Sequence, residues 1–341
     1  MLSFLMTLLL SSSCVELTHF CAGDETPPKA KDHLPIGSCW YCGEIHEDPC
    51  PFEEEEEDDG LICVDNCIYE CLNPCCLRGV WLPEAPPLFL PFKADPRQLA
   101  ASAGWRFYDQ VIGKHVIDVS YFDTIQMYRW FNIGLPCGQL EFDIDGALWA
   151  VFEPTAPTSP LVNADYYVGG SLNYAWDSWS FRLRAYHISS HIGDEFLLEH
   201  PGFDRRNPSA EYVDLYASYY LDGDTLRLYL GGGYIVHRDP SFRCERIYGE
   251  GGAELYFPWF HLFSTCHMIQ GRPYFAVNLR CRQEHDWDLD QTYVLGYEFA
   301  KLYGLERKLR FYFEYHEGYS LEGQFCHART DYFSFRISYG F

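Results

Sequence analysis

The feature that most constrains the fold is a strict alternation of apolar and polar side chains at the end of the chain, over residues 330–341. Phe333, Phe335 and Ile337 fall on one face of an extended segment, and the mostly polar residues between them fall on the other, because strand side chains point alternately to opposite faces. A half-buried strand of a soluble sandwich and a strand of a membrane barrel both show this pattern. Repetition of the alternation along the chain decides between the two folds.

The alternation recurs over the rest of the chain from about residue 101. Leu226 and Leu228, for example, alternate with Arg227 and Tyr229. A soluble core would not hide so many Arg and Glu side chains on one side of a closed sheet, whereas a polar lumen inside a lipid-facing apolar belt accommodates them. We therefore predict an all-β fold, an antiparallel transmembrane β-barrel of about twelve strands over residues 101–341. The expected strands are residues 104–121, 125–132, 138–152, 163–176, 179–190, 210–222, 225–236, 248–257, 272–284, 292–302, 308–318 and 329–341.

The connections between the expected strands alternate in length, except for the long connection at residues 258–271. Residues 177–178 and 222–224 are tight turns, whereas residues 191–209, 237–247 and 319–328 are long. Bacterial outer-membrane barrels have short periplasmic turns and longer loops outside, and a chain that ends on an aromatic residue in this register resembles the closing strand of such a barrel. The long connections and any site beside them are therefore expected outside.

Composition agrees with this interpretation and excludes one class of partner. Aromatic residues make up 18% of the chain, which suits a barrel with aromatic girdles at two membrane interfaces. The mean hydropathy is −0.22, and no apolar run is long enough for a transmembrane helix. The net charge of −24 argues against nucleic-acid binding, which needs a basic face. We predict the bacterial outer membrane as the location and its lipid as a partner.

Two segments outside the expected barrel have their own signatures. Residues 1–23 are predicted to be a signal peptide, because a short apolar core is followed by serines and small residues. Cleavage after Gly23 is favoured, with a relaxed lipoprotein-type processing site at Cys14 as the alternative. Residues 81–100 contain several prolines and are predicted to be a stiff linker.

Residues 24–80 are predicted to be a cysteine-rich, acidic and largely irregular segment. Cys39 and Cys42 form a Cys-x-x-Cys pair near His46, which would indicate zinc in a cytosolic protein but favours disulfides in an exported one. The consecutive acids of residues 53–59 predict a solvated loop. The segment resembles the disulfide-linked, cysteine-rich envelope proteins of chlamydia-like bacteria, which implies such proteins as partners. Its cysteines are Cys39, Cys42, Cys50, Cys63, Cys67, Cys71, Cys75 and Cys76.

Three motifs resemble an uncharacterised bacterial family, catalogued as domain of unknown function 1207. They are residues 94–97 (Ala-Asp-Pro-Arg), 163–166 (Asn-Ala-Asp-Tyr) and 184–195 (Arg-Ala-Tyr-His-Ile-Ser-Ser-His-Ile-Gly-Asp-Glu). The resemblance covers residues 94–341, so the cysteine-rich segment lies outside it. It implies an outer-membrane barrel and no particular activity.

The third motif also carries side chains that can do chemistry. His187 and Ser189 share a face of their strand with Leu183, so both are expected to point toward lipid near the outer leaflet. An unpaired His and Ser in that position indicate a function or an interfacial partner. The arrangement is similar to that of the outer-membrane phospholipase family, whose His-x-Ser dyad faces lipid.

This similarity implies the roles of an acyl hydrolase. Ser189 would attack an ester and His187 would take its proton, as in nucleophilic catalysis. Asn207 would orient the imidazole as in the phospholipase family, or Glu211 would do so as in the outer-membrane lipid A deacylases. The phospholipase family follows its Ser with Asn-Gly, where this chain has Ser-His, so His191 competes with His187 as the base.

Asp194 and Glu195 begin the long outer connection, and their carboxylates are candidate ligands for calcium. A structural alternative is that these acids form a hydrogen-bonded network with His187, Ser189 and His191 that pins the connection. The sequence therefore leaves three functions open. The first is a structural or interaction protein of a disulfide-linked envelope, the second is a phospholipase or lipid A deacylase, and the third is a small-solute porin.

Overall fold

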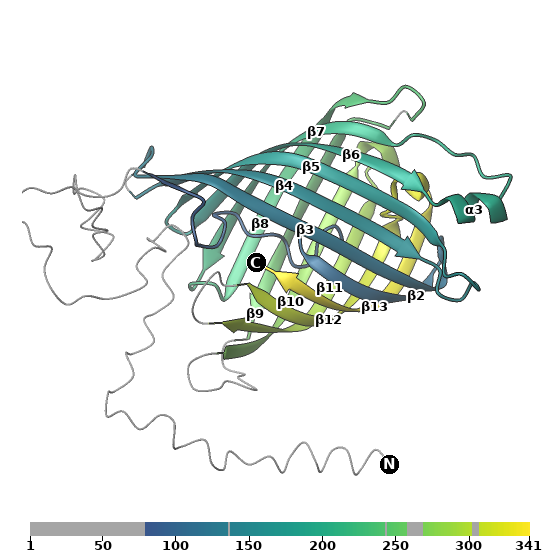
Figure 1. The fold of residues 1–341 in the computed structure, drawn as a ribbon. Coiled ribbons are helices and arrows are strands. Elements are labelled where there is room, and N and C mark those ends of the chain that lie inside the picture. The colour runs from purple at the N-terminus through teal and green to yellow at the C-terminus, as the bar shows by residue number, and fades with distance from the viewer. Residues whose placement is uncertain (1–78, 136, 243, 258–268, 302–306) are drawn as a thin grey trace, which may run out of the picture. The chain divides into compact units, whose positions relative to one another are not determined.

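The computed structural model describes residues 79–341 except 136, 243, 258–268 and 302–306 (Figure 1). The predicted signal peptide and nearly all of the predicted cysteine-rich segment lie outside the described residues. None of the helices in the described ranges has the length and apolar composition that a membrane-spanning helix requires.

Twelve strands, β2 to β13, form one closed antiparallel barrel, as the alternation predicts (Figure 1). Neighbours along the chain pair with each other, and the ring closes where β13 pairs with β2. A short additional strand, β1, pairs with β3 alone. The strands are β1 (Gly79–Trp81), β2 (Ala101–Asp109), β3 (Gly113–Phe131), β4 (Gln139–Phe152), β5 (Leu161–Trp176), β6 (Trp179–Ile192), β7 (Ser209–Leu221), β8 (Leu226–Arg238), β9 (Ile247–Tyr256), β10 (Ile269–Arg282), β11 (Leu289–Lys301), β12 (Lys308–Tyr319) and β13 (Arg329–Gly340).

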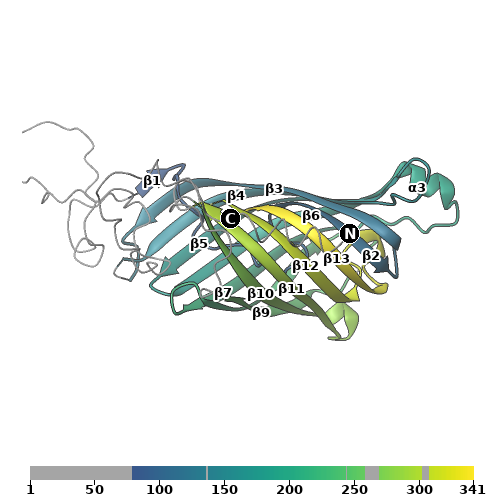
Figure 2. The same ribbon diagram turned by 90° about the horizontal axis from the view of Figure 1, so that it is seen from below.

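In the part of the chain that the structure describes, helical segments occur in three of the connections. They are α3 (Asp194–Glu199) between β6 and β7, η1 (Gln283–His285) between β10 and β11, and η2 (Gly323–Phe325) between β12 and β13. Figure 2 shows α3 projecting from the end of the barrel opposite to β1. We call the end that carries α3, η1 and η2 the outer end, following the expected orientation.

The boundary between the first two barrel strands was predicted wrongly. The turn lies at residues 110–112, not at 122–124, so that β3 runs unbroken through the position of the expected break. Asp109 fixes the real turn, because its Oδ1 accepts hydrogen bonds from the backbone N–H groups of Val111 (3.0 Å) and Ile112 (3.1 Å). An Asp side chain that bonds its own backbone a few residues on is a turn former, and this local signal was missed.

The two faces of the barrel wall differ as the alternation predicts. On β13, Phe333 is 58% exposed on the outside, whereas Ser334 and Arg336 are only 2% and 3% exposed on the inside. Arg and Glu side chains on the inner face pair with one another across neighbouring strands. Arg310 Nε lies 2.7 Å from a Glu298 carboxylate oxygen, for example. The wall therefore has an apolar outer surface and a charged, internally neutralised inner surface.

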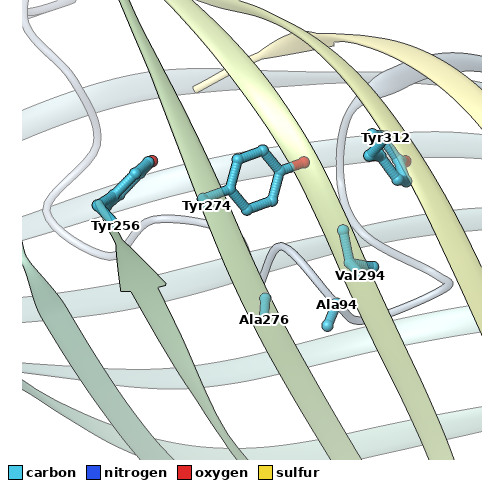
Figure 3. Packing of buried hydrophobic residues seen from close by; sticks show 6 residues of the cluster. All are labelled: Ala94, Tyr256, Tyr274, Ala276, Val294 and Tyr312. Atoms are coloured by element: carbon cyan, nitrogen blue, oxygen red, sulfur yellow. The ribbon is translucent and has the colours of Figure 1, made fainter. Parts of the chain in front are cut away.

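Most of the predicted linker, residues 81–100, lies inside the barrel, whereas Trp81 and Leu82 at its start are exposed. Leu88, Phe89, Phe92 and Ala94 are all almost completely buried there. Figure 3 shows Ala94 beside inward-facing side chains of β9 to β12. We call residues 83–100 the inner segment.

Polar contacts tie the backbone of the inner segment to the wall. Arg227 on β8 donates hydrogen bonds to the carbonyl oxygens of Leu90 (2.8 Å) and Pro91 (3.1 Å). Arg129 on β3 donates in the same way to the Pro86 carbonyl (2.6 Å). A buried carbonyl without a partner is costly, so these arginines satisfy groups that the segment could not leave unpaired.

Side chains of the inner segment also pair with the wall. The Lys93 ammonium group lies 2.8 Å from Glu254 Oε2, and the Lys93 backbone N–H donates to Glu254 Oε1 at 2.7 Å. Phe92 stacks on Tyr229 with ring centroids 3.8 Å apart. Near the outer end, Arg97 forms an ion pair with Asp165 at 2.5 Å. The inner segment is thus bonded to several strands along its length.

We predict that Lys93→Met destabilises the barrel. The substitution keeps most of the side-chain volume but leaves the buried Glu254 carboxylate with Arg227, at 3.6 Å, as its one remaining ion-pair partner among the described residues. Breaking a buried ion pair typically costs about 3–5 kcal/mol, and we expect a value at the lower end because Arg227 remains. Urea unfolding in detergent, followed by tryptophan fluorescence, measures the change in the free energy of unfolding.

The control is Arg206→Met, which breaks an ion pair with Asp204 that is largely exposed to solvent. Exposed pairs contribute little, so this variant should unfold like the wild type. Equal stability of Lys93→Met and the wild type would contradict the view that this pair holds the inner segment in the lumen.

Candidate functional site

A cluster of polar side chains lies on the outside of the barrel, at the outer end of β6, β7 and β8. His187 on β6 lies directly opposite Glu211 on β7, and Glu211 in turn lies opposite His237 on β8. Leu183 and Leu215, further along β6 and β7 on the same face, are exposed apolar side chains. The cluster therefore belongs to the outer face of the wall and not to the lumen.

Glu211 holds both imidazoles. Its Oε1 lies 3.0 Å from His187 Nδ1, and its Oε2 lies 2.6 Å from His237 Nδ1. The three side chains are 37% (His187), 45% (Glu211) and 72% (His237) exposed, so the cluster is accessible from the outer face. A carboxylate on Nδ1 fixes the tautomer of a histidine and leaves Nε2 free to accept a proton.

His237 enters the cluster through a break in the strand register. The pairing of β7 with β8 shifts between Glu211 and Tyr212, so that Val236 is passed over and His237 faces Glu211. An extra residue of this kind is a β-bulge, which redirects the side chains beyond it. Simple alternation assigns His237 to the inner face, and no signal in the sequence of β8 reveals the bulge. His237 was accordingly missed.

Ser189 lies on the same outward face of β6 as His187. Two residues along a strand span about 6.6 Å, so the two side chains leave neighbouring points of one surface. Ser189 lies opposite Tyr166 on β5 and Ser209 on β7, and within the described part of the chain its hydroxyl has no hydrogen-bond partner. The hydroxyl is thus available beside a carboxylate-bound imidazole.

Of the two residues expected to orient His187, Glu211 contacts it and Asn207 does not. The Asn207 amide lies in the connection before β7 and donates a hydrogen bond to Asp239 Oδ2 at 2.9 Å. Asp239 follows β8, so this bond joins two outer connections. The alternation of faces along a strand cannot predict the direction of the Asn207 side chain, because Asn207 precedes Ser209, the first residue of β7.

The remaining residues of the motif point in different directions. Ser190 faces inward and donates to Asn163 Oδ1 at 3.0 Å, whereas His191 is exposed and packs edge-on against Tyr166. Asp194 and Glu195 are exposed in the first turn of α3, where Glu195 Oε2 accepts a hydrogen bond from Thr158 at 3.1 Å. The expected network between these acids and the outward histidines is not among the hydrogen bonds of the described residues.

The surroundings of the outward cluster are apolar. Val168 on β5 lies directly opposite His187 and is exposed, as is Val213 next along the face of β7. A hydroxyl, an imidazole and a carboxylate in this order are the groups that acyl transfer uses. An apolar wall beside them suits a substrate with hydrocarbon chains.

A model of the family described as "Protein of unknown function (DUF1207)" matches residues 46–341 of the chain. The match begins within residues 24–80, so the expectation that the whole cysteine-rich segment lies outside the family is wrong. The comparison with curated proteins finds no match. Among solved structures, outer membrane phospholipase A from Escherichia coli is similar with a TM-score of 0.44 and 10% identity, covering 71% of this chain and 91% of that one.

Two further solved barrels are similar with lower TM-scores. The transport unit of the autotransporter AIDA-I from Escherichia coli has a TM-score of 0.38 and 12% identity, with 74% of this chain and 93% of that one covered. LpxR from Salmonella typhimurium has a TM-score of 0.34 and 10% identity, with 71% of this chain and 100% of that one covered. At these values nothing follows about the activity of this chain.

Proposed function

We propose a role for this chain, which belongs to the DUF1207 family of proteins of unknown function, as an outer-membrane barrel whose lumen is closed by its own inner segment. The barrel would serve a structural or interaction role in the envelope and would not conduct small solutes. The observation that carries this proposal is the pair of hydrogen bonds from Arg227 to the carbonyls of Leu90 and Pro91. A segment bonded through its backbone to the wall is a fixed part of the barrel.

The outer face supports the membrane location. Phe313, Phe333 and Leu295 are exposed apolar side chains on three neighbouring strands, and every backbone ladder of the barrel is paired in a closed ring. Only helices and closed barrels satisfy all backbone groups within a bilayer. Lipid is therefore the partner that the outer face fits.

A closed lumen has a measurable consequence. We expect the purified protein to give no channel openings in planar bilayers, because residues 83–100 occupy the lumen. The double variant Phe92→Ala, Arg227→Ala removes a ring stacked on Tyr229 and two backbone hydrogen bonds, and it should show conductance. Single-channel recording at matched protein amounts checks both results.

The matched control is Leu228→Ala, which changes the neighbouring residue on the outer face of β8. This variant should give no channel openings. Conductance by the wild-type protein would support the small-solute porin instead. A double variant that folds, shown by its heat-dependent shift on a gel, and stays silent would also count against closure by the inner segment.

The envelope role extends to the cysteine-rich segment. Disulfides are the expected state of cysteines in an exported chain, and those of residues 24–80 would join this protein to other envelope proteins. Non-reducing gels of envelopes should then show high-molecular-weight species that collapse with reductant. Replacing Cys63, Cys67, Cys71 and Cys75 by Ser should remove most of these species, whereas an unchanged pattern would refute the cross-linking.

A second candidate function, an outer-leaflet acyl hydrolase, is favoured by the 3.0 Å contact between His187 and Glu211 beside Ser189. The Ser189 hydroxyl would attack the ester carbonyl of a phospholipid or of lipid A, with its proton passing to His187 Nε2. The imidazolium would then give the proton to the departing alcohol oxygen, and water would release the fatty acid from Ser189 by the same steps in reverse. Glu211 would stabilise the imidazolium, and Asp194 and Glu195 are the proposed calcium ligands.

The hydrolase predicts release of fatty acid by protein reconstituted with phospholipid or lipid A, measured with and without calcium. Ser189→Ala and His187→Ala should each lower the rate by at least about 10³-fold, because a nucleophile and its base act as one unit. Glu211→Gln should lower the rate less, and Asn207→Ala should have little effect because its amide bonds Asp239. Asp194→Asn and Glu195→Gln should remove any calcium dependence.

Ser209→Ala is the matched control, since Ser209 lies directly opposite Ser189 on β7 and plays no part in the mechanism. Its rate should equal that of the wild type. Absence of release by the wild-type protein under both conditions would eliminate the hydrolase and leave the structural role. Release that survives both substitutions would show that Ser189 and His187 do not carry the chemistry.

A further inference from the structure

Two connections at the outer end bring three metal-ligating side chains together. Glu284 belongs to η1 between β10 and β11, and Cys326 and His327 follow η2 between β12 and β13. One ligand atom of each residue, namely a carboxylate oxygen, Sγ and an imidazole nitrogen, lies within 4.8 Å of the other two. The cluster is separate from the outward His187 cluster on β6 to β8.

The distance between Glu284 and His327 fits two ligands of one small ion better than it fits a hydrogen bond. Glu284 Oε1 lies 3.5 Å from His327 Nε2, and the two atoms form no hydrogen bond. Zinc binds nitrogen and oxygen ligands at about 2.0–2.1 Å, so two ligands of a tetrahedral ion are about 3.3–3.4 Å apart. The observed separation is close to that edge length.

One oxygen of the buried Glu284 carboxylate lacks a hydrogen-bond donor. Its side chain is only 7% exposed, and Oε1 is a buried oxygen that accepts no hydrogen bond within the described residues. A buried carboxylate oxygen without a donor is costly, and such an atom in a native structure requires an explanation. A cation between Glu284, Cys326 and His327 would coordinate that oxygen.

Contacts that involve no ion fix the backbone around Cys326 and His327. His285 Nε2 donates a hydrogen bond to the Cys326 carbonyl at 3.0 Å, and its ring stacks on Tyr319 at 3.5 Å between centroids. The Ala328 N–H donates to the Phe325 carbonyl at 2.8 Å, which closes the turn that carries Cys326 and His327. Hydrogen bonds and ring contacts around the ligands of a metal ion hold those ligands in their orientation.

We propose that Glu284, Cys326 and His327 bind a zinc ion that ties the β10–β11 connection to the β12–β13 connection. One thiolate, one imidazole and one carboxylate are ligands that zinc accepts, whereas calcium and magnesium prefer oxygen alone. Three protein ligands leave a fourth position for water or for a ligand from outside. The ion would stabilise the outer end independently of the envelope and hydrolase roles.

A disulfide is the competing state of Cys326. Cys326 packs against an apolar cluster that contains the buried Cys244 from the β8–β9 connection, and both are free thiols. An oxidising compartment favours a disulfide between any two cysteines that can reach each other. A Cys244–Cys326 bond would withdraw the thiolate from the metal, so the two states exclude each other.

The test uses the full-length protein, refolded in detergent with zinc and separated from free metal. Because the cysteines before residue 77 could also bind zinc, the decisive quantity is the difference between variants. Cys326→Ser and His327→Ala should each contain one zinc ion per chain fewer than the wild type by mass spectrometry of the metal. His327 is exposed, so its substitution leaves the fold intact even if Cys326→Ser does not refold.

Cys281→Ser is the matched control, since Cys281 is a free cysteine on β10 outside the cluster, and its zinc content should equal that of the wild type. With cobalt in place of zinc, Cys326→Ser should also lose part of the thiolate-to-cobalt absorption that Cys281→Ser keeps. Equal zinc content in the wild type and His327→Ala would overturn the proposal. Detection of a Cys244–Cys326 disulfide in the refolded protein would overturn it as well.

Discussion

The width of the barrel determines much of the rest of the structure. Eight strands give an interior that side chains alone can fill, and the diameter grows with the number of strands, so twelve strands leave a lumen. The inner segment fills that lumen, but its carbonyls then need donors from the wall. Arg129 and Arg227 provide them, and their own charges need carboxylates such as Glu141 and Glu254. The charged inner face and the inner segment therefore depend on each other.

Alternation in the sequence predicts the wall because it records a physical difference between lipid and lumen at every second residue. It identified the number of strands and the face of each side chain on regular strands such as β13. It failed at the first hairpin, since residues 113–131 alternate through the expected break and only the local bonding of Asp109 marks the turn. Periodicity therefore predicts the face on which a side chain lies, whereas the position of a turn depends on single residues such as Asp109.

The inner segment could not be predicted from periodicity at all. Prolines between residues 83 and 91 indicate an extended chain, which a solvated linker and a lumen filler share. The same limit applies to the outward site. Alternation predicted one outward face for His187 and Glu211, and the register of β6 with β7 brings the two opposite each other. His237 was missed because a bulge reverses its face, and Glu284 and Cys326 were missed because turns bring them together.

The closed lumen also indicates where chemistry can occur in this protein. Arg310 and Glu298 on the inner wall neutralise each other and lie behind the inner segment, so a ligand from solution has no direct route to them. Two groups with unused bonding capacity lie outside the lumen. They are the accessible hydroxyl of Ser189 on the outer face and the Glu284 carboxylate, which is buried beside the exposed His327 in the outer connections. Both positions lie where the regular strand pattern gives way, because a regular wall position is already committed to lipid or to an internal partner.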